Sequence, residues 1–417
     1  MNRKLKIALI GLGTVGQGVV KVLDNFDDIE IVCAVVKNLS KKRDVNVKNL
    51  TDDIKQAVEN PEVDVVVEVA GGIGVFDALK TAIQNKKHIV TANKELLAKK
   101  GAELFDLARQ NDVSILYEAA VAGGIPIIGP IKTSLKANKF DSVLGILNGT
   151  TNYILTKMEE ENLSYEACLK KAQELGFAET DPTGDVEGYD AMYKIAILAN
   201  IVFNKRIDVN KIYREGIVKV SADDIKTADE LGYKIKLIAQ AKRNYEGVLD
   251  IRVHPMLLPK NHSLSWIKES TNSVMLSGFP VDKVMFTGKG AGEFPTASSV
   301  VGDILSVKAE FEENKDILPM MKCNHSEFAN QINIEHTANC YYLSILASNA
   351  PGVIGKIGNS CAKYGINISY IIQKGTRADG YARIIVITEE CFEKDMNSMI
   401  EELELDGTKV INRIRVM

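Results

Sequence analysis

Residues 5–16 of the chain, LKIALIGLGTVG, decide the fold. Residues 5–10 form a short apolar run, which is typical of a buried strand. An amphipathic helical pattern follows from Thr14 to about Phe26. A strand, a glycine-rich turn and a helix in direct succession predict the first βα unit of a parallel sheet.

The turn between this strand and this helix has the spacing GxGxxG. Gly11 allows a tight turn, Gly13 lets a pyrophosphate approach the backbone, and Gly16 lets the helix pack close to the strand. The free N–H groups at the start of the helix attract phosphate. We therefore expect a dinucleotide to bind here; the alternative is a glycine turn without a ligand.

Four further apolar runs follow, at residues 30–36, 64–69, 88–91 and 113–117. Polar segments with helical patterns separate them. Strands that are almost continuously valine and isoleucine, alternating with helices, indicate a parallel sheet covered on both faces. The right-handed crossover rule then predicts an α/β, doubly wound sheet of the Rossmann type.

The pattern changes after about Ile127. Residues 129–289 are predicted to form an α+β substrate and dimerisation domain, and a helical run from Thr296 is predicted to return to the first domain. Residues 310–336 are charged and polar, which favours a linker. Residues 340–417 show the order βαββαβ of a ferredoxin-like domain. The expected domains are therefore 1–128 with a returning segment at about 290–320, 129–289, and 340–417.

The composition excludes several classes of protein. The 417 residues carry a net charge of −4, which offers no electrostatic basis for binding nucleic acid or an anionic membrane. No apolar run approaches the roughly 20 residues that cross a bilayer. The six cysteines are scattered without a CxxC pair, and the five histidines form no zinc motif. A cytoplasmic location is expected.

The end of the second predicted strand bears on the choice between NAD and NADP. NAD enzymes usually place an acid there to bind the ribose 2′-hydroxyl. This chain instead has Lys37, followed by Lys41, Lys42 and Arg43. Cations at this corner would attract a 2′-phosphate, so the sequence favours NADP, although such residues can also form an ordinary exposed loop.

Two lysines and one aspartate are the candidates for proton transfer. Lys94 follows the fourth strand, at the edge of the sheet where ligands of such folds bind. Asp190 and Lys194 are four residues apart, on one face of a helix expected to begin near Asp185. A lysine becomes a better base beside a second cation, so Lys94 near Lys194 would help both, with Asp190 holding the geometry. The alternatives are a solvated lysine and a surface ion pair.

Six stretches together resemble the homoserine dehydrogenase family. They are GLGTVGQGVV at 11–20, TANKELLA at 91–98, YEAAVAGGIPII at 117–128, LNGTTNYIL at 147–155, AETDPTGDVEGYDAMYKIAIL at 178–198 and GAGEFPTASSVVGD at 290–303. The resemblance implies interconversion of L-homoserine and L-aspartate 4-semialdehyde, most usefully the reduction with NADPH.

The same resemblance implies roles for individual residues. Lys94 corresponds to a substrate and proton-relay lysine and Lys194 to the proton donor and acceptor. Glu179 corresponds to the carboxylate that binds the substrate amino group, and Asp185 and Asp190 to further active-site acids. It also implies a cofactor site and a sodium site. The cofactor residues are Gly11, Leu12, Gly13, Thr14, Val15, Gly16, Lys37 (where arginine is more usual), Thr91, Lys94 and Gly292; the sodium residues are Glu118 and the carbonyls of Val121, Gly123 and Ile125.

The C-terminal block resembles an ACT domain. Asn349, Gly352, Asn367 and Ile368 fall where such domains bind amino acids between paired copies. The resemblance suggests threonine as a feedback inhibitor, and a homodimer or homotetramer. The alternative is a dimerisation module without a ligand.

Two other functions compete with this interpretation. An aspartate-semialdehyde dehydrogenase shares the cofactor fold but needs a thiolate nucleophile, for which Cys168 is the only cysteine in the central region. A non-enzymatic regulator could combine a Rossmann domain with an ACT domain, but it would have no use for Lys94, Glu179 and Lys194.

Overall fold

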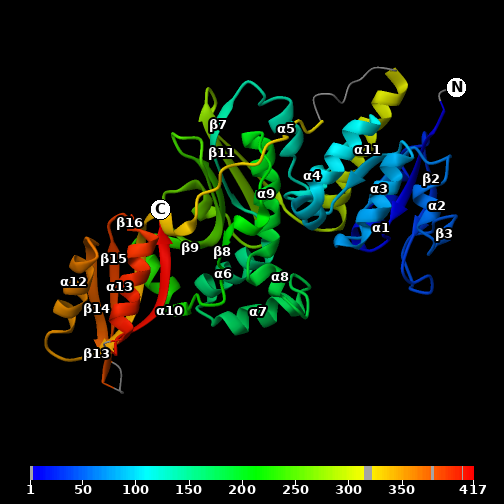
Figure 1. The fold of residues 1–417 in the computed structure, drawn as a ribbon. Helices are drawn as coiled ribbons and strands as arrows, with labels where there is room; N and C mark the ends of the chain where they lie inside the picture. The colour runs from blue at the N-terminus through cyan, green and yellow to red at the C-terminus, as the bar shows by residue number, and fades with distance from the viewer. Residues whose placement is uncertain (1–2, 314–321, 377–379, 406) are drawn as a thin grey trace. The chain divides into compact units, whose positions relative to one another are not determined.

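The computed structural model describes residues 3–313, 322–376, 380–405 and 407–417 (Figure 1). The chain divides into two compact units, each built from three segments. Unit 1 comprises Met1–Gly149, Asp190–Asn210 and Ser270–Ala329, and unit 2 comprises Thr150–Tyr189, Lys211–Glu269 and Asn330–Met417. The predicted domain boundaries stay predictions, and residues 314–321 of the predicted linker lie outside the described residues.

Unit 1 contains a six-stranded parallel sheet, which confirms the predicted doubly wound fold. Its order is β3-β2-β1-β4-β5-β6. The bounds are β1 Leu5–Ile10, β2 Ile29–Val35, β3 Leu50–Thr51, β4 Val65–Glu68, β5 His88–Thr91 and β6 Ile115–Leu116. The helices of this region are α1 Thr14–Leu23, α2 Lys55–Val58, α3 Phe76–Gln84, α4 Lys94–Asn111 and α11 Glu293–Glu313.

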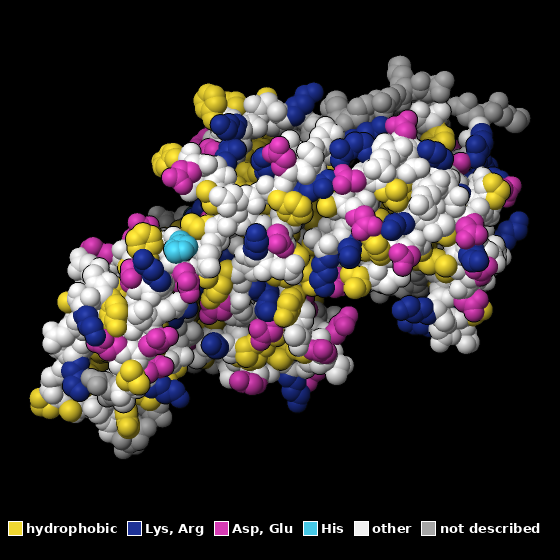
Figure 2. Space-filling view, viewed as in Figure 1, with side chains coloured by type: hydrophobic (Ala, Val, Ile, Leu, Met, Phe, Trp, Pro, Cys, Tyr) yellow, Lys and Arg dark blue, Asp and Glu magenta, His cyan; other side chains and the backbone are white. Residues whose placement is uncertain are grey.

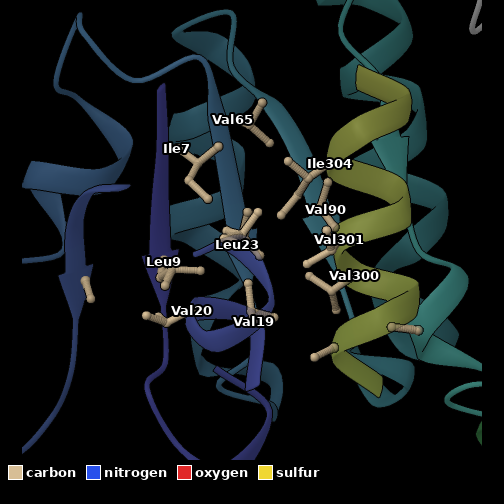
Figure 3. Close-up of a cluster of buried hydrophobic side chains, with 14 of the residues drawn as sticks. Ile7, Leu9, Val19, Val20, Leu23, Val65, Val90, Val300, Val301 and Ile304 are labelled. Carbon is tan, nitrogen blue, oxygen red and sulfur yellow. The ribbon is translucent and has the colours of Figure 1, made fainter. Parts of the chain in front are cut away.

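Helix α11 comes from far along the chain but packs into the same core as α1 (Figure 3). Strand residues Ile7 and Leu9 contribute one side of this cluster. Branched strand side chains on a face covered by helices explain why the strands are nearly continuous valine and isoleucine. The labelled helix residues in the cluster are Val19, Val20 and Leu23 from α1, and Val300, Val301 and Ile304 from α11.

Unit 1 also holds a three-stranded antiparallel group. Its strands are β7 Lys139–Ile146, β11 Thr271–Phe279 and β12 Asp282–Lys289, with β11 paired to both others. Strands β11 and β12 are consecutive in the chain and antiparallel, so residues 271–289 form a β-hairpin. The short helix α5, Ile128–Lys132, precedes β7, and most of α9, Tyr189–Phe203, belongs to this unit.

Unit 2 is built on a second sheet, of order β9-β10-β17-β13-β15-β14. The C-terminal strands confirm the predicted βαββαβ order. The strands are β8 Tyr213–Arg214, β9 Tyr233–Arg243, β10 Leu249–Pro259, β13 Ala338–Ser348, β14 Ile368–Thr376, β15 Tyr381–Thr388, β16 Cys391–Phe392 and β17 Lys409–Val416. The helices are α6 Gly149–Glu161, α7 Tyr165–Glu174, α8 Thr183–Val186, α10 Ala222–Glu230, α12 Val353–Lys363 and α13 Glu393–Leu405.

On the face shown in Figure 2, basic and acidic side chains lie intermixed. Among the described residues, no helix combines the length and the apolar character that crossing a bilayer requires.

Lys236, on β9, is a cation buried in the core of unit 2. Its ammonium donates to the Asn152 side-chain oxygen at 3.1 Å and to the Ile267 carbonyl at 2.7 Å. Burial lowers the pKa of Lys236 to about 8. Because the unfolded chain holds this proton more tightly than the folded one, the folded state is disfavoured below the ordinary lysine pKa.

Lys236→Met tests this linkage. Between the folded pKa of about 8 and the unfolded value of about 10.4, the unfolded chain binds more protons, so raising the pH stabilises the wild type. The wild type should gain about 2 kcal/mol relative to Lys236→Met between pH 8 and pH 10. Urea unfolding of both proteins at the two pH values measures this gain, and parallel pH dependences would contradict it.

Candidate active site

The glycine turn after β1 has the geometry that its sequence predicts. Gly11 has φ +100°, and a Cβ there would lie 2.7 Å from the Ala70 nitrogen. A Cβ on Gly16 would lie 2.4 Å from the Gly11 carbonyl oxygen. A Cβ on Gly13 would meet nothing within 4 Å. Two glycines are thus required by packing, whereas Gly13 leaves open space beside the helix N-terminus, which fits a pyrophosphate.

Thr91, at the end of β5, is buried and uses its hydroxyl within the protein. It donates to the Glu68 carboxylate at 2.7 Å and accepts from the Asn93 backbone N–H at 3.0 Å. Glu68 also accepts from the backbone N–H groups of Ala70 and Gly71. Burial raises the pKa of Glu68, against these hydrogen bonds. Sequence reasoning missed this acid, which ties the ends of β4 and β5 together.

The basic corner after β2 contains one anchored cation. The Arg43 guanidinium donates to the carbonyl oxygens of Leu12 at 3.4 Å, Lys41 at 2.7 Å and Asn38 at 2.8 Å. Lys37 is exposed. Arg43 therefore lies against the glycine turn, in a position suited to a phosphate on the adenosine ribose, whereas Lys37 is a solvated lysine in this structure.

Lys94 and Lys194 meet at the carboxylate of Asp190, within unit 1. The Lys94 ammonium lies 3.2 Å from Asp190 Oδ1, and the Lys194 ammonium lies 2.6 Å from Asp190 Oδ2. Lys194 also donates to the Leu147 carbonyl at 2.8 Å. The structure therefore brings together all three residues that the sequence singled out for proton transfer.

This cluster is not an ordinary surface ion pair. The side chains of Lys194 and Asp190 are 9% and 12% exposed, while Lys94 is 43% exposed. Burial alone would raise the pKa of Asp190, but the charges of Lys194 and Lys94 and its hydrogen bonds lower it below the ordinary value. Asp190 therefore stays ionised between the buried Lys194 ammonium and the exposed Lys94 ammonium. Such a carboxylate can hold a proton donor in place, while the exposed side leaves room for a substrate.

Asn148 completes this cluster and was missed by sequence reasoning. It is the second residue after the end of β7, is buried, and donates from Nδ2 to Asp190 Oδ2 at 3.0 Å. Its only signal in the sequence is its position between a strand and a helix, inside LNGTTNYIL. The adjacent Leu147 carbonyl accepts a hydrogen bond from Lys194, so two consecutive residues contact the Asp190–Lys194 ion pair.

The helix that carries Asp190 and Lys194 begins later than predicted. The expected start near Asp185 is wrong, because α8 ends at Val186 and α9 starts at Tyr189. Gly188 separates them with φ +82°. The predicted i,i+4 contact of Asp190 and Lys194 on one helix is present.

Glu179 and Asp185 belong to unit 2, unlike the lysine cluster. Glu179 is exposed, and its backbone carbonyl accepts from the Gln173 side chain at 3.1 Å. Asp185 lies in the short helix α8 and is partly buried. Their predicted contacts with substrate stay predictions.

The predicted sodium residues lie in a buried loop of unit 1. The Glu118 carboxylate is already occupied, because it accepts from the backbone N–H groups of Ile127, Ile128 and Gly129 at 2.6–2.8 Å. Ser299 donates to the Gly123 carbonyl. Among the described residues, no recorded hydrogen bond ends on the carbonyls of Val121 or Ile125. A cation held by backbone carbonyls fits this loop, and the part of Glu118 in binding sodium stays a prediction.

The remaining cofactor residue, Gly292, immediately precedes α11. It has φ +122°, and its carbonyl accepts from the Thr296 N–H at 3.2 Å.

Within the described residues, no group of three or more histidine, cysteine or acidic side chains could hold a metal ion. Cys168 is buried, which raises its pKa, so this thiol does not suit the nucleophile of the semialdehyde dehydrogenase alternative.

The predicted effector residues form two groups in the C-terminal block. Asn349 and Gly352 follow β13, while Asn367 immediately precedes β14 and Ile368 begins it. Strand β15 pairs with both β13 and β14, so it gives the distance between the two groups. Ser348 pairs with Tyr381 at one end of β15, and Ile368 pairs with Thr388 at the other. At about 3.4 Å per residue, the two groups lie roughly 24 Å apart along this strand. One copy of the block therefore does not join them into one site.

The chain is similar to known homoserine dehydrogenases along its length. Residues 126–305 match the homoserine dehydrogenase family, 11–118 its NAD binding domain, and 341–404 the ACT domain. The chain is 42% identical to a homoserine dehydrogenase of Synechocystis sp., with 99% of each covered. The crystal structure of a homoserine dehydrogenase from Thiobacillus denitrificans is similar, with a TM-score of 0.94, 35% identity, and 100% of this chain and 98% of that chain covered.

A hyperthermophilic archaeal homoserine dehydrogenase solved in complex with NADPH is also similar. Its TM-score is 0.64 at 25% identity, and the match covers 74% of this chain and 98% of that one.

Substitutions at Gly13 and Gly16 should separate cofactor binding from packing. Gly16→Ala places a Cβ against a backbone carbonyl at 2.4 Å, so we expect a loss of about 1–3 kcal/mol in stability. Gly13→Ala meets no neighbour and has φ −83°, so its thermal midpoint should match the wild type while dinucleotide affinity falls roughly ten-fold. Calorimetry and cofactor titration of both variants measure this, and equal effects on stability would contradict it.

Proposed function

The chain belongs to the homoserine dehydrogenase family, as an NAD(P)-dependent oxidoreductase with a C-terminal ACT domain, and from this premise we propose that Lys194, Asp190 and Lys94 form its proton-transfer site. The reaction interconverts L-homoserine and L-aspartate 4-semialdehyde. The observation that carries the proposal is the contact of both ammonium groups with one buried carboxylate.

When bound, the nicotinamide accepts or supplies the hydride. The chain must move one proton at the substrate oxygen and orient the substrate. Lys194 takes the hydroxyl proton in oxidation and returns it in reduction, because it is the buried member of the pair. Asp190 steadies the ammonium form, and the Lys94 charge opposes it, which eases proton release. Glu179 and Asp185 are carboxylates suited to the substrate ammonium.

NADP is the proposed cofactor. Arg43, anchored against the Leu12 carbonyl, supports this choice, since a guanidinium binds phosphate through paired N–H donors. Lys37 is a second candidate for the same phosphate. The relative described as complexed with NADPH is consistent with it.

We also propose a sodium ion, an amino-acid effector and a cytoplasmic location. The buried carbonyls of Val121 and Ile125 suit a cation with oxygen ligands, and Glu118 would contribute its carbonyl. The two separated effector groups favour threonine binding between copies of the ACT domain, which requires at least a homodimer. Six free thiols support a reducing compartment.

Initial rates of L-homoserine oxidation test the function. We expect turnover with a lower KM for NADP than for NAD, inhibition by L-threonine, and lower activity when choline replaces sodium in the buffer. Phosphate-dependent oxidation of the semialdehyde would indicate the alternative dehydrogenase. No turnover with either cofactor would favour the non-enzymatic regulator.

Lys194→Ala tests the assigned proton carrier. Removal of a general acid–base group should lower kcat about 10²–10⁴-fold while NADP affinity stays unchanged. Lys99→Ala is the matched control, because Lys99 is a helical lysine of α4 paired with Glu95 and should leave kcat unchanged. Near-normal turnover of Lys194→Ala with saturating substrate and cofactor would contradict the assignment.

A further inference from the structure

Asp190 has a third partner, which differs from the two lysines in carrying no charge. The Asn148 amide donates to Asp190 Oδ2 at 3.0 Å, the same oxygen that accepts from Lys194 at 2.6 Å. Oδ1 is left to Lys94. Asn148 is 4% exposed, so water does not readily take its place.

The main chain beside Asn148 reinforces this contact. Leu147 accepts from the Lys194 ammonium through its carbonyl at 2.8 Å. Since β7 ends at Ile146 and α6 begins at Gly149, both residues occupy the short connection between two regular elements. This connection therefore contacts both Asp190, through Asn148, and Lys194, through the Leu147 carbonyl.

We propose that Asn148 is a positioning residue for proton transfer, holding the Asp190 carboxylate by a neutral hydrogen bond so that Lys194 can release its proton. This inference rests on the proposed function of Lys194. A carboxylate that accepts one more N–H is a weaker base and pulls less on the ammonium. An amide achieves this without a third cation near the two lysines, and it fixes the rotation of the carboxylate between them.

Loss of the amide should therefore alter the pH dependence rather than simply lower the rate. Without the donor, Asp190 holds the Lys194 proton more tightly, so the base is neutral only at higher pH. In Asn148→Ser the hydroxyl is one bond closer to the main chain than the amide nitrogen and falls short of Asp190, so the apparent pKa in the kcat/KM profile for homoserine oxidation should rise by about one unit, as expected for one charge-assisted hydrogen bond. Below the apparent pKa the rate then falls roughly ten-fold, and the difference from the wild type closes at pH values above it.

Asn148→Asp keeps the shape but replaces the donor with a second carboxylate. Its profile should move further in the alkaline direction, because a like charge beside Asp190 stabilises the ammonium form of Lys194. NADP affinity should be unchanged in both variants. Should Asn148→Asp fail to fold, Asn148→Ser alone still tests the proposal through the position of its profile.

Asn200, which lies on helix α9 together with Asp190 and Lys194, offers a matched control. Its amide donates to the Ala196 carbonyl and its oxygen accepts from the Ile207 N–H, so it is also an internally bonded asparagine. Asn200→Ser and Asn200→Asp should keep the wild-type profile. A uniform loss at every pH in Asn148→Ser, or no change, would overturn the inference, whereas full activity of Lys194→Ala would instead overturn the proposed function.

Discussion

The sharing of one buried carboxylate by two ammonium groups is the interaction on which the site depends. Lys194 alone, four residues after Asp190 on a helix, would form a pair of the kind that contributes only a few tenths of a kcal/mol at a surface. The contact becomes a site because Lys94 reaches the second oxygen from another element. The charges around Asp190 keep it ionised despite burial, so the cluster has a fixed anion around which a proton can move.

The parallel sheet supplies one side of that arrangement. Strands in this order present their carboxyl ends at a common edge, where the glycine turn, Glu68 and Thr91 lie on neighbouring strands. Glu68 bonds the backbone after its own strand and the Thr91 hydroxyl of the next. Because α4 starts only three residues after Thr91, the same buried acid that bonds the backbone after β4 also helps to fix the position from which Lys94 starts.

The parts of the fold that the sequence predicts well are those with a periodic apolar signal. Strands β1 and β5 were predicted with their observed ends, because both faces of a parallel sheet are covered and leave continuous branched residues. Strand β9 was missed, because Lys234, Lys236 and Lys242 interrupt the apolar pattern of a strand that is largely buried. The break between α8 and α9 was also missed, because the acidic residues around it suit a helix start equally well.

For the site, spacing predicts the Asp190–Lys194 contact, but nothing periodic brings Lys94 to it. That contact depends on segments almost 100 residues apart, and here the family resemblance carried the information. The resemblance assigns no role to Asn148, although this residue lies inside LNGTTNYIL, or to Glu68, and single polar residues at strand ends are usually ordinary turn residues.

The C-terminal block illustrates the limit of a linear description of domains. After a polar segment it looks independent, yet β17 pairs with β10, and the buried Asp224 of α10 accepts from Tyr342, Arg383 and Asn412 of the block. Removing one partner of such a buried ion pair costs roughly 3–5 kcal/mol, because the other charge is left unpaired. Any movement of the block must therefore move α10 with it or break this cluster. The smaller cost is to move both, so the block and α10 are expected to behave as one mechanical unit.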